Sequence, residues 1–229
     1  MARTVEGLLR RAGRGAVPPR GFTLLETSFA LVVIGVGVLA FVEAHQAFIQ
    51  NNSWSSRAAT GTYLANEIRE MMRRLPRHDP VTGLYFTGSG ESAVLRGWGI
   101  ETGEVDLTDF DDVDDFSGLV FGAAGTFEGP INAFGEVIPQ TDVSGAVVIG
   151  SGGRPLPLRG WTQRVLVEKA DPTNYGAGVG SAFFVPAGGG NPGRAVDRFP
   201  LRVTVVVEHM LDGALRAEEI TRVTWVVPD

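Results

Sequence analysis

The feature that most constrains this chain is a run of apolar residues from Phe22 to Phe48, whose only ionisable side chains are Glu26, Glu43 and His45. A helix of about 20 apolar residues is long enough to cross the hydrocarbon core of a membrane. A charged carboxylate at the centre of a bilayer costs about 2.5–3.5 kcal/mol on insertion scales, so Glu26 calls for an explanation. We therefore predict a transmembrane helix over residues 22–48, in which Glu26 has a specific task.

The charge of the chain is divided unevenly. Residues 1–21 hold five arginines and one glutamate, a net charge of +4, whereas the whole chain of 229 residues carries −6, which leaves −10 for residues 22–229. A basic head before an apolar run predicts a single-pass protein with a cytoplasmic N-terminus and an exported C-terminal part. An acidic exported part argues against nucleic-acid binding, because phosphate groups repel it. The chain has no cysteine, which excludes disulfides and thiolate metal sites.

Three interpretations of the apolar run remain open. The first is a cleaved secretory signal, against which the small-residue cleavage pattern near Val38-Leu39-Ala40 is weak and the run is long. The second is an uncleaved anchor that tethers an unrelated binding protein or enzyme to the membrane. This second interpretation accounts for the arginines and the length but gives Glu26 no task.

The third interpretation rests on the segment Arg20-Gly21-Phe22-Thr23-Leu24-Leu25-Glu26. It resembles the prepilin peptidase signal of type IV pilins and type II secretion pseudopilins, in which a basic leader ends in Gly. The resemblance implies cleavage after Gly21 and N-methylation of Phe22. It also makes Glu26 the fifth mature residue, which in the family pairs with the N-terminal amine of a neighbouring subunit and sets the register of a helical fibre.

Elementary electrostatics agrees with this pairing. Cleavage would create an α-amino group on Phe22, and such groups have a pKa of roughly 8 and are mostly cationic at neutral pH. Glu26 lies four residues further on, about 6 Å of helix rise, so the two charges can neutralise each other within one chain or between subunits. A simpler interpretation is that Thr23 and Glu26 form a capping box, which would close the first helical turn. Capping and pairing are compatible.

The helix is expected to continue past the membrane over residues 49–75. Apolar side chains recur there at helical spacing, and Pro76 ends the pattern; the stripe consists of Leu64, Ile68, Met71, Met72 and Leu75. We expect this stripe to pack against a sheet.

Residues 76–229 predict a loop-rich α+β exported domain. Strand patterns appear within residues 160–172 and 199–229, where Leu201, Val203, Val205 and Val207 would share one face and Thr221, Val223, Trp225 and Val227 another. Asp212-Gly213 predicts a hairpin turn between them. The predicted fold class is therefore α+β, a long N-terminal helix with a transmembrane half and an amphipathic half packed on a small antiparallel sheet of three to five strands, as in pilins.

The segment DLTDFDDVDDFSG places six aspartates within ten residues, at Asp106, Asp109, Asp111, Asp112, Asp114 and Asp115. One interpretation is a solvated acidic loop, anchored to the core by Val113 and Phe116. The other is a structural Ca²⁺ bound by Asp109, Asp111, Asp112, Asp114 and Asp115, because hard oxygen ligands suit this ion. The spacing is not that of an EF-hand. The part DDVDDFSG also resembles minor pilins related to type IV pilus modification proteins and to mannose-sensitive haemagglutinin pili.

Neither the histidines nor the glycines suggest catalysis. His45, His78 and His209 are scattered without ligand spacing, and the segment from Gly188 to Gly193 lacks the following helix that a phosphate-binding loop needs. We therefore expect no enzymatic activity and no cofactor apart from the alternative of Ca²⁺.

Together these patterns predict a minor type IV pilin in the bacterial inner membrane. Its segments would be a cleaved leader over residues 1–21, the assembly helix over 22–48, its amphipathic continuation over 49–75 and the periplasmic domain over 76–229. Its expected partners are the prepilin peptidase, membrane lipid before assembly, an inner-membrane assembly platform and other pilins in the fibre. A mature chain of 208 residues is long for a bulk fibre subunit, which favours a minor one. The alternatives are a type II secretion minor pseudopilin and an uncleaved membrane-tethered binding protein.

Overall fold

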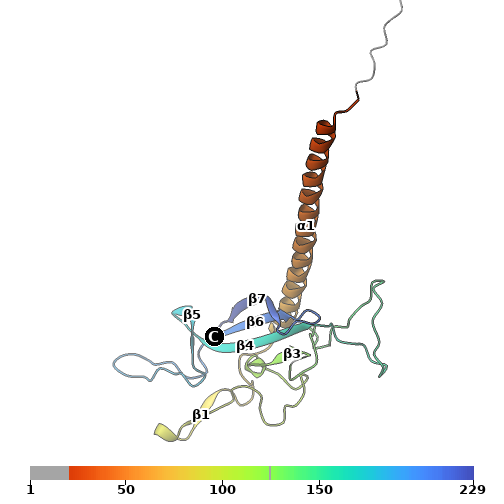
Figure 1. Cartoon of the computed structure of the whole chain (residues 1–229). Coiled ribbons are helices and arrows are strands. Elements are labelled where there is room, and N and C mark those ends of the chain that lie inside the picture. The colour runs from red at the N-terminus through yellow and green to blue at the C-terminus, as the bar shows by residue number, and fades with distance from the viewer. Residues whose placement is uncertain (1–20, 124) are drawn as a thin grey trace, which may run out of the picture. The chain divides into compact units, whose positions relative to one another are not determined.

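A computed structural model describes residues 21–123 and 125–229, so the predicted basic leader, apart from Gly21, lies outside the described residues. The described chain forms two compact units, residues up to Asn52 and residues from Ser53 onward. Figure 1 shows the elements: α1 (Leu24–Met72), β1 (Tyr85–Thr87), η1 (Gly90–Ser92), β2 (Val94–Arg96), η2 (Asp114–Phe116), β3 (Val120–Gly122), β4 (Trp161–Asp171), β5 (Asn174–Val179), β6 (Leu201–His209) and β7 (Glu218–Val227).

The first unit contains the N-terminal part of α1. Every described residue from Gly21 to Asn52 is exposed, including the apolar ones. A helix that is apolar on all sides is stable in lipid or when packed by other helices rather than in water. The helix is long and apolar enough to cross a membrane, as the sequence predicts. It ends at Met72, slightly before the predicted residue 75, and Pro76 follows the last turn.

The second unit is built around one antiparallel sheet of five strands. The strand order is β3-β4-β6-β7, and β5 pairs with the far end of β4. The register places Val165 of β4 beside Val205 of β6, and Val205 beside Val223 of β7. This row of valines joins the three long strands, which explains why the alternating valines predicted this part of the sheet. The separate ribbon β1-β2 is too short to have a sequence signal.

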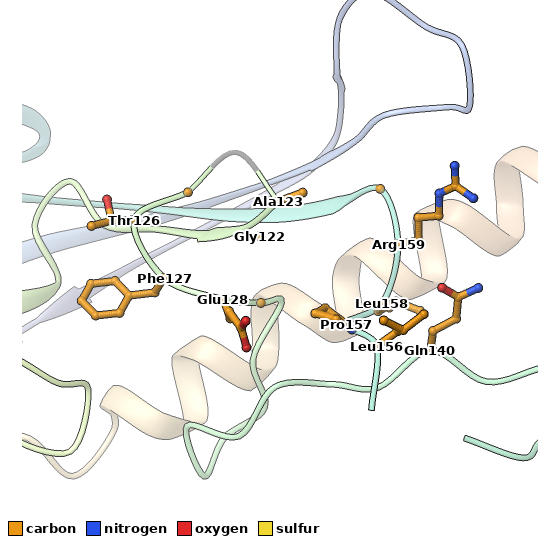
Figure 2. A pocket seen from close by; sticks show the side chains of 13 residues that line it. Gly122, Ala123, Thr126, Phe127, Glu128, Gln140, Leu156, Pro157, Leu158 and Arg159 are labelled. Atoms are coloured by element: carbon orange, nitrogen blue, oxygen red, sulfur yellow. The ribbon is translucent and has the colours of Figure 1, made fainter. Parts of the chain in front are cut away.

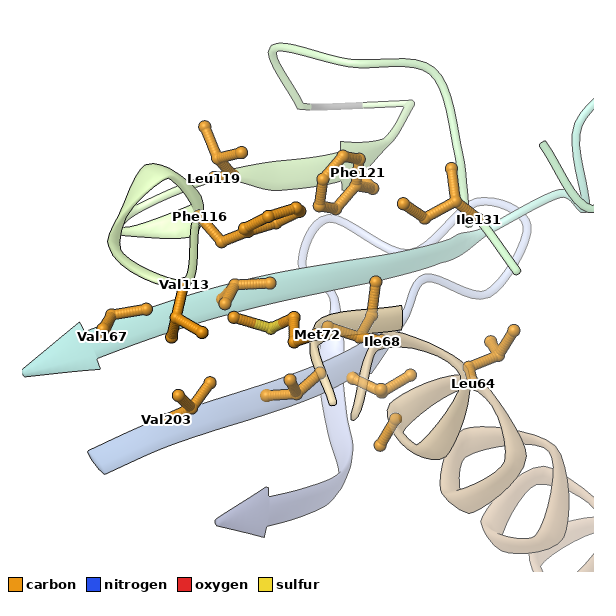
Figure 3. Packing of buried hydrophobic residues seen from close by; sticks show 14 of the residues in the cluster. Leu64, Ile68, Met72, Val113, Phe116, Leu119, Phe121, Ile131, Val167 and Val203 are labelled. Atoms are coloured by element: carbon orange, nitrogen blue, oxygen red, sulfur yellow. The ribbon is translucent and has the colours of Figure 1, made fainter. Parts of the chain in front are cut away.

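The amphipathic end of α1 packs on this sheet. Leu64, Ile68 and Met72 are buried, and Figure 3 shows their side chains within the same cluster as Phe116 and Phe121. The predicted α+β fold class, with a long N-terminal helix packed on antiparallel sheet, is therefore confirmed, and the arrangement is consistent with a pilin-like fold.

A glycine sets how closely the helix approaches the sheet. A β-carbon added at Gly61 would lie 2.9 Å from Cγ2 of Ile220, closer than normal van der Waals contact. The helix continues through Gly61 without interruption. Gly61 therefore allows close contact between α1 and β7.

The hairpin between β6 and β7 lies where Asp212-Gly213 predicts it. Gly213 has a φ of +80°, and the N–H of Ala214 donates to the carbonyl of Leu211, which closes a turn around the Asp-Gly pair. The connection is longer than a two-residue turn, because the last paired residues are His209 and Glu218. Pairing stops early because the intervening residues are exposed, so no buried face holds them in register.

A buried glutamine links the helix, the sheet and a loop. The Gln163 side chain is fully buried on β4, and its Nε2 donates to the carbonyls of Leu64 (2.8 Å) and Ile131 (3.0 Å). The N–H of Ile131 donates in return to Oε1 of Gln163 at 2.7 Å. Buried backbone groups of this kind are expensive to leave without partners.

We predict that Gln163→Leu lowers the free energy of unfolding by about 1–3 kcal/mol or more, because the N–H of Ile131 loses its partner in the core. Urea unfolding of the full chain in detergent, followed by tryptophan fluorescence, measures the loss. Leu166→Ala on the outer face of the same strand is the control and should cost less. Equal stability of Gln163→Leu and the wild type would contradict the role assigned to this side chain.

Candidate functional site

The first candidate site is the start of α1. The N–H of Thr23 donates to Oε2 of Glu26 at 3.3 Å, and the N–H of Glu26 donates to Oγ1 of Thr23 at 3.2 Å. This reciprocal pair is a capping box, so the simpler interpretation of Glu26 is present in the structure. The helix begins directly after Thr23, at Leu24.

The predicted cleavage bond lies just outside this box. Gly21 and Phe22 precede the helix, Phe22 is 81% exposed, and a side chain added at Gly21 would meet no atom within 4 Å. The carboxylate of Glu26 already contacts the amide of Thr23, one residue from the atom that would become the new N-terminus. Thus the structure brings Gly21, Phe22 and Glu26 together in one short accessible segment.

We predict that Thr23→Ala loosens the first turn of α1. Loss of an N-cap costs about 1 kcal/mol, or about fivefold in the opening equilibrium that controls amide exchange. Hydrogen exchange of the full chain in detergent should show faster exchange at Glu26. Thr62→Ala removes a hydroxyl from the C-terminal part of the helix and should leave exchange at Glu26 unchanged. Unchanged amide exchange in Thr23→Ala would show that the capping box does not stabilise the first turn of α1.

The second candidate site is the predicted acidic segment, which is largely buried. Asp112, Asp114 and Asp115 are at most 1% exposed, so the interpretation of a solvated loop is wrong for these three. Val113 and Phe116 are buried as predicted and anchor the segment to the core. Burial of carboxylates requires compensating partners, because removing a charge from water is costly.

Asp112 and Asp115 make reciprocal hydrogen bonds, in which the side chain of each accepts backbone N–H groups from the segment of the other. Oδ1 of Asp112 accepts the N–H groups of Asp114 (2.8 Å) and Asp115 (3.1 Å). Oδ2 of Asp115 accepts the N–H groups of Asp111 (3.1 Å) and Asp112 (3.2 Å). The exchange fixes both carboxyl groups but uses only one oxygen of each.

The side chain of Asp114 contacts His78 and Gly99 instead. Its Oδ2 lies 2.6 Å from Nδ1 of His78, and its Oδ1 accepts the N–H of Gly99 at 3.3 Å. Burial lowers the pKa of His78 to about 4, so the ring is neutral and Nδ1–H donates to the Asp114 carboxylate. Both oxygens of Asp114 are therefore occupied, and this residue has a structural role.

A buried lysine supports the same region. Lys169 on β4 is fully buried, donates to the carbonyl of Ser181, and lies 5.7 Å from the ring centroids of Trp98 and Phe199. Burial lowers its pKa to about 8, while the charge of Asp114 opposes this change. Lys169 thus supplies a positive charge that interacts with Asp114.

Two glutamates that sequence reasoning missed complete the acidic cluster. Ligand atoms of Glu101, Glu104 and Asp115 lie within 4.8 Å of one another, and so do those of Asp111, Asp112 and Asp115. Of the five aspartates predicted as ligands, Asp109 and Asp114 belong to neither group. Asp109 is exposed and accepts backbone N–H groups of its own loop.

One cavity beside the sheet does not resemble a catalytic site. About 510 Å³ in volume, it lies between the end of β3 and the segment before β4, as Figure 2 shows. Its described lining is mainly glycine backbone and the side chains of Leu156, Pro157 and Leu158. Glu128 and Arg159 are the only charged residues among the described lining, and no histidine or second acid accompanies them. Acid–base or nucleophilic catalysis usually needs such converging groups.

Comparison with protein-family models, with curated proteins and with solved structures gives no match to this chain. The family resemblance of residues 20–48 therefore rests on the sequence pattern, and its consequences are proposals.

Proposed function

We propose that this protein is a minor type IV pilin, a structural and assembly subunit of a pilus-like fibre. The observation that carries the proposal is the segment from Arg20 to Glu26 directly before a helix whose apolar residues are exposed on all sides. The accessible Gly21–Phe22 bond and the membrane-length helix support it. The sheet that packs on the amphipathic end of α1 is consistent with it.

The proposed sequence of events follows from these parts. The chain inserts in the inner membrane with its N-terminus in the cytoplasm and its sheet domain in the periplasm. Prepilin peptidase cuts after Gly21 and methylates the amine of Phe22, which stays protonated as a secondary amine. On assembly the apolar helix leaves the lipid and is surrounded by the helices of neighbouring subunits. Glu26 then neutralises the amine of Phe22 in an apolar setting.

A type II secretion minor pseudopilin would share this signal, and the genes next to this one would distinguish the two systems. An uncleaved membrane-tethered binding protein is the alternative of another class. N-terminal sequencing of the protein from its own cell separates that alternative, because an uncleaved chain would retain residues before Phe22.

We predict that Gly21→Val blocks cleavage and leaves a precursor about 2 kDa heavier than the mature chain. The added side chain would meet nothing within 4 Å in this chain, so any effect reports on the fit to the peptidase. Immunoblots of membrane fractions measure the product. Gly35→Ala, also free of neighbours within 4 Å, is the matched control and should be cut normally. A normally cut Gly21→Val protein would contradict the assignment of the signal.

We predict that Glu26→Gln is cut normally but enters fibres at least tenfold less often, because the cationic amine of Phe22 is left without a charged partner in an apolar setting. Glutamine retains the shape and an oxygen that can cap Thr23. Quantitative immunoblots of sheared fibres and of membranes measure the distribution. Glu43→Gln, which neutralises the other acid of the apolar run, is the control and should assemble. Wild-type assembly of Glu26→Gln would leave the capping box as the whole role of Glu26.

A further inference from the structure

Four carboxylate oxygens in the acidic cluster are buried without a donor. Among the described residues, Oδ2 of Asp112, Oδ1 of Asp115 and both side-chain oxygens of Glu101 are inaccessible and have no hydrogen-bond partner. Asp112 and Asp115 are themselves almost completely buried. A buried carboxylate oxygen without a donor carries a large desolvation penalty, which either a bound cation or a proton shared between carboxyl groups would relieve.

The backbone fixes the direction of these free oxygens. Each of Asp112 and Asp115 uses one oxygen to accept two N–H groups of the other's segment, so neither carboxyl group can rotate without breaking two hydrogen bonds. Glu104 is held similarly, because its Oε2 accepts the N–H of Glu101 at 2.8 Å. The cluster is therefore preorganised, with oxygens converging from two separate loops.

We propose that these oxygens bind a divalent cation of the size of Ca²⁺, with Asp115 as the shared ligand, Glu101 and Glu104 on one side and Asp111 and Asp112 on the other. Ca²⁺ binds carboxylates at 2.3–2.6 Å, so oxygens around one ion lie at most about 5 Å apart. The ligand atoms of each group lie within 4.8 Å of one another, which is inside this limit. Mg²⁺ requires shorter bonds of 2.0–2.1 Å and stricter octahedral geometry.

Shared protons are the competing explanation. Burial and the neighbouring carboxyl groups raise the pKa of Glu101 and of Asp112 to about 9, so without a cation these groups would hold protons at neutral pH. A proton can join two carboxyl groups, but it satisfies one pair at a time. A cation satisfies the ligand oxygens of a whole group together, because each of them can supply a lone pair to it.

The proposed ligand set differs from the one that the aspartate pattern suggests. It includes Glu101 and Glu104, and it leaves out Asp114, whose oxygens contact His78 and Gly99. The cation would join the loop around residues 101–104 to the segment around η2, and η2 contributes Phe116 to the core. Cation binding is therefore expected to stabilise the sheet domain, whether or not the protein assembles into a fibre.

Isothermal titration calorimetry of the full chain in detergent, treated with a chelator and then titrated with CaCl₂, tests the proposal. We expect saturable binding at submillimolar concentration and a rise of several degrees in Tm, with a smaller rise for the same concentration of MgCl₂. Absence of binding up to millimolar Ca²⁺, or equal rises with Ca²⁺ and Mg²⁺, would overturn the proposal.

Glu101→Gln is the most informative variant, because it removes a ligand charge and keeps the size of the side chain at a residue that is only partly buried. We expect it to fold and to weaken Ca²⁺ binding on the order of tenfold or more, since ligand charge sets the affinity of such sites. Asp106→Asn, an exposed acid of the same segment outside both groups, should bind Ca²⁺ like the wild type. Equal losses in the two variants would show that Ca²⁺ responds to overall charge, and unchanged binding in Glu101→Gln would remove Glu101 from the site; either result contradicts the proposal.

Discussion

The sheet domain depends on the burial of one helical stripe. Leu64, Ile68 and Met72 of α1 supply the apolar surface that covers the face of β4 and β6, and a fully buried side chain of this kind contributes about 1.5–3 kcal/mol. The part of the same helix before Asn52 is largely apolar, and all of its residues are exposed. Its two parts therefore need different surroundings, the sheet for one and lipid or other helices for the other.

The predictable parts of the fold are those whose residues carry a strong local period. Valines two residues apart on β6 and β7, and apolar residues three or four apart on α1, give the correct elements because one face of each is buried. The ribbon β1-β2 and strand β3 were not predicted, since three-residue strands are too short for a period to appear. The length of the β6–β7 connection was also not predictable, because it depends on where burial ends rather than on the Asp-Gly turn.

The acidic segment shows a different limit of sequence reasoning. Six aspartates in ten residues favour a solvated loop when only their charges are considered. Asp112 and Asp115 can be buried because the carboxyl group of each accepts the backbone N–H of the other. The spacing of the aspartates alone does not specify these hydrogen bonds. Glu101 and Glu104 were missed for a related reason, because only folding brings their loop against η2. A Glu-x-x-Glu pair upstream of an aspartate run is a weak signal that would have suggested them.

The capping box at the start of α1 has a consequence for the proposed cleavage. The first turn is closed by hydrogen bonds that join Thr23 to Glu26 and to Thr27, and all three residues lie on the C-terminal side of the Gly21–Phe22 bond. A cut at that bond would break none of these hydrogen bonds, so the turn that they close would be kept if the proposed cleavage takes place. Processing at this position would therefore change the charge at the end of the helix while leaving its secondary structure intact, and a precursor could wait in the membrane already in its final local conformation.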